Sequence, residues 1–462
     1  MKIQSKSIKH VIASEAKQSR TRIGAGLLCC CASRNGIVCS LRYVFILAVL
    51  FTFTACNGEY EYESIYTTEY YQIQTPESVP EPTPSPEPVV MQTTPTPRPN
   101  PCFMCPSEEW IASLTLREKI GQLIMPRLPW QTIEMSVALE QWFVDYPVGG
   151  IILFSDNVVS IQQVQALTAD LQAVAPHPLL IATDEEGGRV SRVGRLFDDA
   201  VPPAFDIGLM GDTDFAFEMG QLAGERLLSL GINMNFAPVA DVWTNPANTV
   251  IGNRAFGREP ELVGLMVEYT IRGLQSVGVL AVAKHFPGHG DTYEDSHYLL
   301  AVYQHNRERF DEIESPPFMQ SIRAGVDGMM IGHIATPKLQ NEIALLEWME
   351  PWLAAGTLPA TFSDFWLQNV LRGEMGFDGL IITDALEMRA LSDHFTHEQI
   401  ALGAFMAGAD ILLMPTDVSA TFNALYSAFH DGIFGETRLH ESLQRIYLAR
   451  KANHADHSHR YS

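Results

Sequence analysis

The stretch from Lys284 to His297 concentrates side chains that can exchange protons or bind ligands. Its sequence is KHFPGHGDTYEDSH, in which three histidines, two aspartates and a lysine are interspersed with glycines and a proline. Titratable groups at this density are costly to bury and contribute little to packing. A reactive or binding site is therefore the natural explanation.

Metal binding is one chemistry that these residue types allow. Imidazole and carboxylate groups are common ligands of divalent metals. The stretch offers five of them: His285, His289, Asp291, Asp295 and His297. The hypothesis is weakened because no helical spacing places these groups on one face, and the intervening glycines indicate a mobile loop. A metal-dependent hydrolase stays a rival interpretation, whereas we expect neither a metal nor another cofactor.

The residues before this stretch indicate the element that positions it. Val279 to Ala283 form a short apolar run with β-branched residues, which is typical of a buried parallel strand. The run then gives way to glycine, proline and polar residues, which indicate an irregular loop. Lys284 and His285 therefore lie at the carboxyl end of a predicted strand, where barrel enzymes place their reactive groups.

Acidic residues follow a second predicted strand, Leu179–Thr183. Asp184 ends this strand, and two more acids and a glycine pair come next in the run DEEGGRV. Glycine lacks a Cβ atom and lets the backbone approach a ligand closely. A solvated turn is the plain alternative, but it does not explain three consecutive acids. We therefore predict that Asp184 faces a ligand.

Two more predicted strands end in residues that could bind or attack a substrate. Ile232–Val239 is followed by Asp241 and then by Arg254 in the run GNRAFG. The guanidinium of Arg254 is a rigid fork of donors that suits hydroxyl groups or a carboxylate, so it could bind a substrate or pair with Asp241. Leu380–Thr383 leads into Asp384, which could act on a substrate or cap the following helix.

Taken together, these runs resemble glycoside hydrolase family 3, in its single-domain β-N-acetylglucosaminidase branch. The Lys284–His297 stretch is similar to the identifying run KHFPGHGDTxxDSH, and DEEGGRV, GNRAFG and TDALEM are similar to three further family motifs. The resemblance covers nearly all of residues 107–450. One departure is Ala301, where the family usually has proline. Many members add a second domain, which we expect to be missing because the chain ends soon after Ile411–Met414.

The resemblance implies roles for the residues at these strand ends. Asp384 is the nucleophile, and His297 is the acid/base, held by Asp295. The remaining residues contact the sugar at the cleavage site: Asp184, Arg254, Lys284 and His285. The dyad is physically reasonable, since histidine titrates near neutral pH and a neighbouring carboxylate fixes its tautomer. Ser296, between its two members, is expected to add only a turn-forming hydroxyl.

The implied activity is that of a retaining exo-β-N-acetylglucosaminidase, which forms a covalent glycosyl-aspartate intermediate and needs no cofactor. Its substrates would be carbohydrates with a terminal N-acetylglucosamine, such as peptidoglycan fragments or chitooligosaccharides. A β-N-acetylglucosaminide phosphorylase or a β-glucosidase of the same fold is an alternative within the enzyme class. A metal-dependent hydrolase and a non-catalytic sugar-binding lipoprotein are more distant alternatives.

The alternation of short apolar runs and helical stretches predicts an α/β fold with a parallel sheet. Strands are expected at Val148–Phe154, Leu179–Thr183, Ile232–Val239, Val279–Phe286, Val326–Ile331, Leu380–Thr383 and Ile411–Met414, and more weakly at Pro359–Phe362. Helical periods span Leu114–Leu123 (with Thr115 as N-cap), Phe215–Leu230, Pro260–Ser276 and His397–Ala407. Because polar clusters follow several different strands, we favour a closed (β/α)8 TIM barrel over an open doubly wound sheet.

Composition narrows the choice of partners. The chain has 462 residues and a formal net charge of -23. A surface this acidic argues against nucleic acid and against electrostatic docking on anionic lipid. All seven cysteines precede Ser107, so the folded part needs no disulfide framework. Cys102 and Cys105 could pair locally or stand so close by chance.

The residues before Ser107 carry the patterns of export. Tyr43–Phe53 is too short to span a bilayer as a helix but suits the apolar core of a signal peptide. The small residues before Cys56 resemble a lipoprotein processing site, which would leave this cysteine lipidated. We expect four regions: a signal peptide region over 1–56 whose start codon could be misassigned, a disordered Pro-rich linker over 57–106, a catalytic domain over 107–452 and a disordered tail over 453–462. The predicted protein is a monomer, lipid-anchored outside the cytoplasm or secreted.

Overall fold

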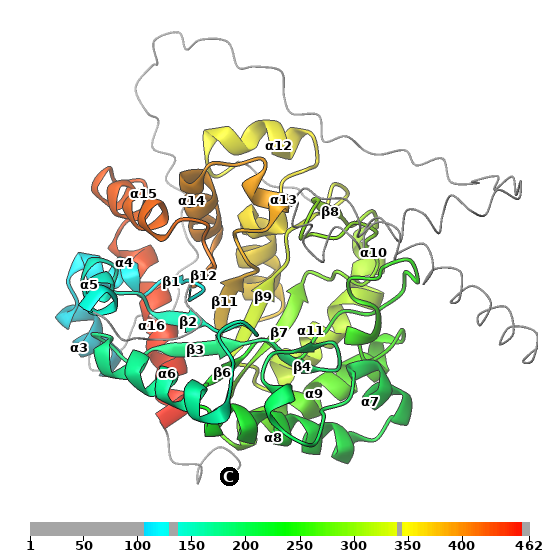
Figure 1. Ribbon diagram of the computed structural model, residues 1–462. Coiled ribbons are helices and arrows are strands. Elements are labelled where there is room, and N and C mark those ends of the chain that lie inside the picture. Colours follow the sequence, from blue (N-terminus) through cyan, green and yellow to red (C-terminus); the bar gives the residue numbers. More distant parts are fainter. Residues whose placement is uncertain (1–105, 129–136, 340–343, 455–462) are drawn as a thin grey trace, which may run out of the picture. The chain divides into compact units, whose positions relative to one another are not determined.

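The computed structural model describes residues 106–128, 137–339 and 344–454 (Figure 1). The predictions for the signal peptide, Cys56, the linker, the cysteine pair and most of the tail lie outside these residues. Within the described parts, no helix is both long enough and apolar enough to cross a membrane.

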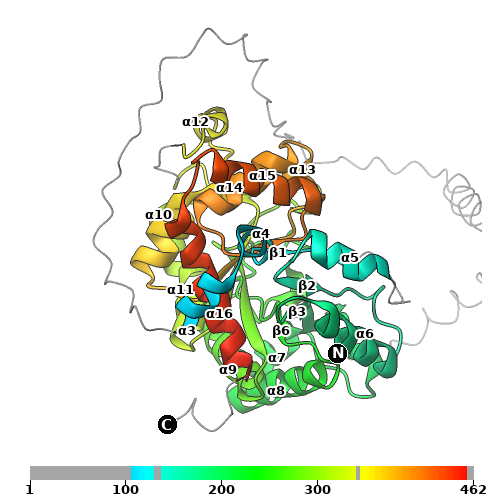
Figure 2. The ribbon, with the colours of Figure 1, turned by 90° about the vertical axis from the view of Figure 1, so that its left-hand side faces the viewer.

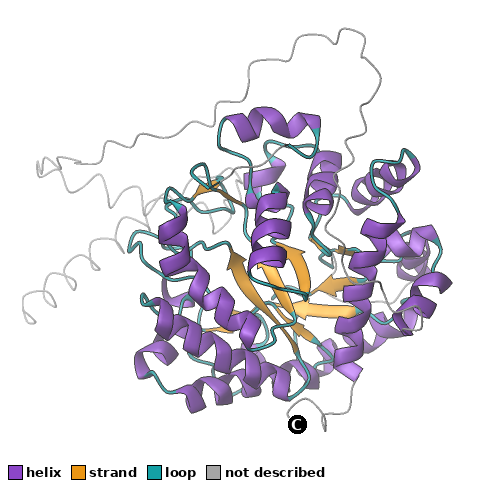
Figure 3. Cartoon of the chain, turned by 180° about the vertical axis from the view of Figure 1, so that it is seen from behind, coloured by secondary structure: helices purple, strands orange, loops and turns teal. Residues whose placement is uncertain are grey.

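A curled parallel sheet forms the core of the fold (Figure 3). The six strands follow the order β11-β9-β7-β6-β3-β2. Their bounds are β2 (Gly150–Ile152), β3 (Leu180–Thr183), β6 (Met234–Asn235), β7 (Leu280–Phe286), β9 (Gly328–Ile331) and β11 (Leu380–Thr383). All neighbours are parallel, and every residue in these strands is buried. This is why their sequences are continuous apolar runs rather than alternating ones.

Two further strands form a separate parallel pair: β1 (Ile124–Met125) and β12 (Leu412–Leu413). A bridge between Arg127 and Ile152 joins the end of β1 to β2, and a bridge between Ile382 and Ile411 joins β11 to the start of β12. The pair therefore meets both edges of the six-stranded sheet, which must curl to reach it.

The predicted strands of the sheet are confirmed, although several are shorter than their apolar runs. The strand predicted at Pro359–Phe362 is wrong. Ala360–Phe362 forms a 3-10 turn, and Pro359 makes an isolated antiparallel bridge with Ala335. A parallel strand that the sequence did not predict is β1, which pairs with β12. It follows a helix so closely that its apolar residues continue the helical pattern.

The predicted helices are confirmed within a few residues at their ends: α4 (Leu116–Gly121), α8 (Thr213–Ser229), α9 (Pro260–Ser276) and α14 (His397–Ala407). Thr115 caps α4 as expected. Its hydroxyl accepts the N–H of Glu118, and the Glu118 carboxylate accepts the N–H of Thr115 at 2.8 Å. This reciprocal capping box satisfies two backbone donors that the first helical turn leaves free.

The remaining helices lie mostly outside the sheet: α3 (Pro106–Ser113), α5 (Val137–Asp145), α6 (Ile161–Val174), α7 (Ala204–Met210), α10 (Arg307–Arg309), α11 (Ser315–Arg323), α12 (Glu350–Ala354), α13 (Arg389–Ser392), α15 (Val418–His430) and α16 (Glu436–His454). Two π-helical segments span Phe310–Glu314 and Phe365–Glu374. Short strands pair on the loops: β4 (Glu185–Gly187) with β5 (Val190–Ser191), and β8 (Ala301–Val302) with β10 (Ile334–Ala335).

Two helices from opposite ends of the described chain brace the fold. In Figure 2, α3 (blue) and α16 (red) lie side by side, and His440 of α16 contacts Glu108 of α3 at 2.8 Å. The buried Asp410, just before β12, pairs with Arg372 at 2.8 Å and with Arg445 of α16 at 3.1 Å. These contacts fix the end of the fold opposite to the carboxyl ends of the strands.

Candidate active site

The carboxyl ends of the strands carry the titratable side chains that the sequence singled out. Asp184 follows β3, Asp241 lies beyond β6, Lys284 and His285 lie in β7, and Asp384 follows β11. Since parallel strands end on the same side of their sheet, these side chains share one region. The hydrogen bonds between them, described below, connect residues up to about a hundred positions apart in the chain.

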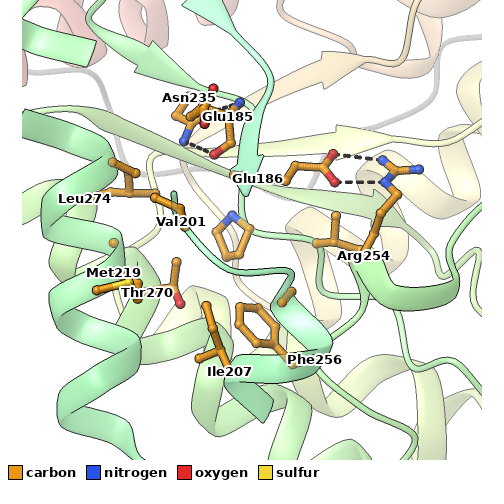
Figure 4. A pocket seen from close by; sticks show the side chains of 16 residues that line it. Glu185, Glu186, Val201, Ile207, Met219, Asn235, Arg254, Phe256, Thr270 and Leu274 are labelled. Carbon is orange, nitrogen blue, oxygen red and sulfur yellow. Dashed lines mark hydrogen bonds and ion pairs between the residues drawn. The ribbon is translucent and has the colours of Figure 1, made fainter. Parts of the chain in front are cut away.

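A chain of ion pairs links Asp184, Lys284, Glu186 and Arg254. Lys284 Nζ lies 2.7 Å from Asp184 Oδ1 and 2.6 Å from Glu186 Oε1. Arg254 binds the same glutamate with two hydrogen bonds, Nε to Oε2 at 2.8 Å and Nη2 to Oε1 at 2.9 Å (Figure 4). The fork of Arg254 therefore has a protein partner, which is Glu186 rather than the Asp241 of the alternative interpretation, and its predicted contact with a substrate stays a prediction.

Electrostatics keeps the three buried members of this chain charged: Lys284, Glu186 and Arg254. Burial lowers the pKa of Lys284, but Asp184 and Glu186 raise it more, so the net shift is upward. Burial likewise raises the pKa of Glu186, but Arg254 and Lys284 hold it well below its usual range. Each charge is thus stable only because its partners are charged. The result is a rigid array in which Asp184, whose side chain stays partly exposed, can meet a ligand.

Sequence reasoning missed the role of Glu186. It noticed three consecutive acids and assigned only Asp184, whereas Glu186 is the centre of the ion-pair chain. Glu186 also lines a small cavity of about 20 Å³, together with apolar groups such as Met219 and Phe256 (Figure 4). A cavity of this size holds about one water molecule. It is therefore too small to be the place where a substrate binds.

His285 is oriented from two sides. Its Nδ1 lies 2.7 Å from Asp241 Oδ2, and its Nε2 lies 3.3 Å from Arg254 Nη2. Asp241 is fully buried. Burial raises its pKa, but His285 and the hydrogen bond from the His289 N–H lower it more, so the net shift is downward. A buried carboxylate that fixes the tautomer of a histidine is a common device for orienting a ligand-binding ring.

Asp384 directly follows β11 and is partly exposed as a residue. Its Oδ1 accepts the N–H of Ala385 at 2.7 Å. Removal from solvent raises its pKa, but His285, His333, the Ala385 N–H and His297 outweigh this effect and lower the pKa to about 2. Asp384 is therefore an ionised carboxylate at neutral pH, as a nucleophile must be.

His333, after β9, supports Asp384 through the backbone. It is fully buried, and burial lowers its pKa, although Asp384 and the hydrogen bond to the Ala385 backbone act in the other direction. Its Nε2 donates to Ala385 O at 3.0 Å, and its Nδ1 lies 2.7 Å from the hydroxyl oxygen of Thr361. Sequence reasoning missed this residue. The rule that identified Asp384 would have found it, because His333 also follows a predicted strand.

The predicted dyad of His297 and Asp295 is formed. His297 Nδ1 lies 2.8 Å from Asp295 Oδ1, which also accepts the His297 N–H at 2.9 Å. The His297 side chain is 61% exposed and that of Asp295 36%. The N–H of Arg389, at the start of α13, lies 3.3 Å from His297 O. The loop therefore reaches the segment that follows Asp384.

The other histidine and aspartate of this loop have separate protein partners. His289 hydrogen-bonds to Thr292 and Ser296, and Asp291 accepts the hydroxyl of Thr244 at 2.6 Å and pairs with His305. Among the residues that the structure describes, no group of three or more His, Cys, Asp or Glu is arranged to hold a metal ion. The metal-ligand hypothesis thus has no geometric support in these residues.

These observations define an α/β protein with a candidate ligand site at the carboxyl ends of a curled parallel sheet. The chain matches the glycosyl hydrolase family 3 N terminal domain over residues 115–449, and it belongs to that family.

Several known proteins are similar to this chain in sequence or in fold. The chain is 39% identical over 280 residues to beta-hexosaminidase A of Pseudoalteromonas piscicida, covering 58% of this chain and 46% of that protein. It is 35% identical to a beta-hexosaminidase of Stenotrophomonas maltophilia, covering 56% and 73%. A solved structure of a family 3 beta-N-acetylglucosaminidase from Paenibacillus sp. str. FPU-7 is 38% identical with a TM-score of 0.68, covering 74% and 63%. The chain thus spans about half of the first relative and less than two thirds of the solved structure.

Proposed function

We propose that the protein is a retaining exo-β-N-acetylglucosaminidase that removes terminal N-acetylglucosamine from peptidoglycan fragments or chitooligosaccharides. One observation carries this proposal: an ionised Asp384 lies in the region reached by a loop with an exposed His297–Asp295 dyad. A nucleophile and a proton donor are the two groups that retaining cleavage requires. The relatives named beta-hexosaminidase support the choice of an acetamido sugar.

In the first half of the reaction, an oxygen of Asp384 attacks the anomeric carbon. The bond from that carbon to the leaving oxygen breaks, and His297 gives the leaving oxygen its Nε2 proton. Asp295 holds the opposite edge of the ring through Nδ1, which stabilises the protonated imidazole before transfer. The products of this half are a glycosyl-Asp384 ester and a free alcohol.

In the second half, water replaces the alcohol. His297, now neutral, takes a proton from the water as its oxygen attacks the anomeric carbon, and the bond to Asp384 breaks. The carboxylate is restored and the histidine is protonated again. Two inversions at the same carbon give net retention.

The residues at the other strand ends hold the sugar. Asp184 offers a partly exposed carboxylate to sugar hydroxyls. The ammonium group of Lys284 donates two of its three protons to carboxylates, and the third remains for a ligand. Arg254 and His285 are tied to protein partners, so they contribute through the donors and ring edges that these contacts leave free.

The proposal also covers the architecture of the folded domain and the location of the protein. The curled sheet and the β1–β12 pair make up a (β/α)8 TIM barrel, which the bridges at Arg127 and Ile411 support. A signal peptide, a Pro-rich linker and lipidation at Cys56 are supported by the sequence patterns alone. We extend the proposal to a monomeric enzyme outside the cytoplasm, anchored at the membrane or secreted, with a role in peptidoglycan turnover.

The full chain would be tested with the 4-nitrophenyl glycosides of β-N-acetylglucosamine and β-glucose. We expect preferential release of nitrophenol from the acetamido sugar, with retention of anomeric configuration by NMR. Preference for the glucoside would instead indicate a β-glucosidase. A folded protein without turnover of either compound would favour a sugar-binding function.

A further inference from the structure

The base of the loop that carries the dyad is fixed to the neighbouring loop after β6. The N–H of His289 donates to Asp241 Oδ1 at 2.7 Å, and the amide of Asn248 donates to His289 O at 2.7 Å. A Cβ atom on Gly290 would lie 1.9 Å from the carbonyl oxygen of Val242. That distance excludes any other residue at position 290 without a backbone shift. Residues 288–292 are therefore a rigid platform.

The tip of the same loop is mostly open to solvent. Tyr293, His297, Tyr298 and Leu299 all have exposed side chains. Exposed groups make few contacts that could hold a fixed orientation. The acid/base histidine therefore needs a link to the platform.

Ser296 provides such a link. It lies between Asp295 and His297, yet it is only 2% exposed. Its Oγ lies 3.0 Å from Nε2 of the buried His289. A single hydrogen bond thus connects the centre of the dyad to the rigid platform.

The direction of this hydrogen bond follows from the partners of His289. Burial and the charge of His285 lower the pKa of His289 to about 4, so the ring is neutral. The hydroxyl of Thr292 donates to His289 O at 2.9 Å, which leaves its oxygen to accept the Nδ1 proton of His289 at 2.6 Å. Nε2 is then an unprotonated acceptor, and the Ser296 hydroxyl donates to it.

We propose that Ser296 is a positioning residue for the acid/base: its hydrogen bond to His289 aims the His297 imidazole at the leaving oxygen. The inference rests on the proposed function and assigns to Ser296 more than the turn-forming hydroxyl expected from sequence. Ser296 touches no reacting atom, so its effect must pass through His297. This makes the effect selective for leaving groups that need a proton.

The test compares two aryl β-N-acetylglucosaminides in full-length Ser296→Ala. The 2,4-dinitrophenyl glycoside leaves without protonation, whereas the phenyl glycoside needs the acid. We expect kcat/KM to fall about tenfold for the phenyl glycoside and to stay within about twofold for the dinitrophenyl glycoside. The ratio of the two values does not depend on the fraction of folded enzyme, so partial misfolding cannot produce the result.

Two controls separate positioning from stability. Ser321→Ala removes an equally buried hydroxyl, which donates to Pro317 O in α11, and should leave both kcat/KM values unchanged. Ser296→Thr keeps a hydroxyl and should restore the wild-type ratio.

A double variant provides the decisive comparison. In a His297→Ala background the acid is gone, so Ser296→Ala should lower the phenyl rate no further. Equal losses on both substrates in Ser296→Ala, or additive losses in the double variant, would overturn the positioning role. A wild-type protein inactive on both glycosides would instead refute the proposed function, which makes the two failures distinguishable.

Discussion

The two groups assigned to bond cleavage lie in contrasting surroundings. Asp384 extends directly from a buried strand, and its carboxylate is held by the next backbone N–H. His297 lies on a long loop, and its side chain is 61% exposed. The contrast matches what each group must do. A nucleophile must stay ionised and aimed at one carbon, whereas an acid/base must exchange protons with leaving groups of varied size and then with water.

The electrostatic surroundings of Asp384 and His297 also differ. Several neighbours act together on Asp384 and lower its pKa to about 2, with His285 the strongest among them. His297 has one charged partner, Asp295, at hydrogen-bond distance. Several neighbours therefore hold Asp384, the proposed nucleophile, ionised at the end of the sheet, whereas His297, the proposed acid/base, lies on an exposed loop.

Replacing the nucleophile should give the largest effect. Asp384→Asn keeps the size of the side chain but removes the attacking charge, so kcat for any aryl glycoside should fall by about 10⁴-fold or more. Steady-state release of nitrophenol measures this, with circular dichroism as the check on folding. Substantial residual activity in a well-folded variant would remove Asp384 from its role and with it the basis of the comparison.

Removing the acid/base should give a smaller effect that depends on the substrate. His297→Ala should lower kcat/KM by about 10² to 10⁴-fold for the phenyl glycoside and by only a few-fold for the 2,4-dinitrophenyl glycoside. The same variant should accumulate the glycosyl-enzyme on the activated substrate, because the second half of the reaction lacks its base. A mass shift on the protein detects that intermediate. If both substrates lost activity alike, His297 would not be the acid.

Loosening the support of Asp384 should lower the activity without regard to the leaving group. His333→Ala removes the donor to Ala385 O, so kcat/KM should fall about tenfold for good and poor leaving groups alike. His333→Gln can place an amide N–H near the position of Nε2 and should recover most of this loss. Equal activity of the two variants would show that the hydrogen bond to Ala385 is unimportant. If the loss depended on the leaving group, His333 would act through the acid/base rather than through Asp384.

The positions of Asp384 and Asp184 could be predicted from the sequence, but the residues that surround them could not. Asp384 and Asp184 could be found because each follows a continuous apolar run, and a parallel sheet gathers such ends on one side. The contacts around them could not be found in this way. Glu186 and Arg254, for example, are 68 positions apart in the sequence and meet only in the fold. Thr361, which holds His333, lies in a segment predicted as a strand, and its 3-10 turn is set by packing rather than by local pattern.

The loop side shows a different limit. The motif located His297 and Asp295, and their adjacency in sequence is enough to make their hydrogen bond. Whether Ser296 faces solvent or the platform depends on the path of the loop, which glycine-rich sequence leaves open. Two-residue strands such as β1 are hidden for a related reason, since so short an apolar run has no period of its own.

The smallest predicted effect is an absence of pH dependence. Asp384 has a pKa lowered to about 2, so its ionised form is complete well above that value and is lost only as the pH falls toward it. In His297→Ala with the 2,4-dinitrophenyl glycoside, the nucleophile acts alone, and kcat/KM should be flat between about pH 4 and about pH 8. An acid limb near pH 5 in the variant, with folding intact, would mean that Asp384 is not held ionised by its neighbours. The contrast between an ionised Asp384 at the end of the sheet and an exposed His297 on the loop would then disappear.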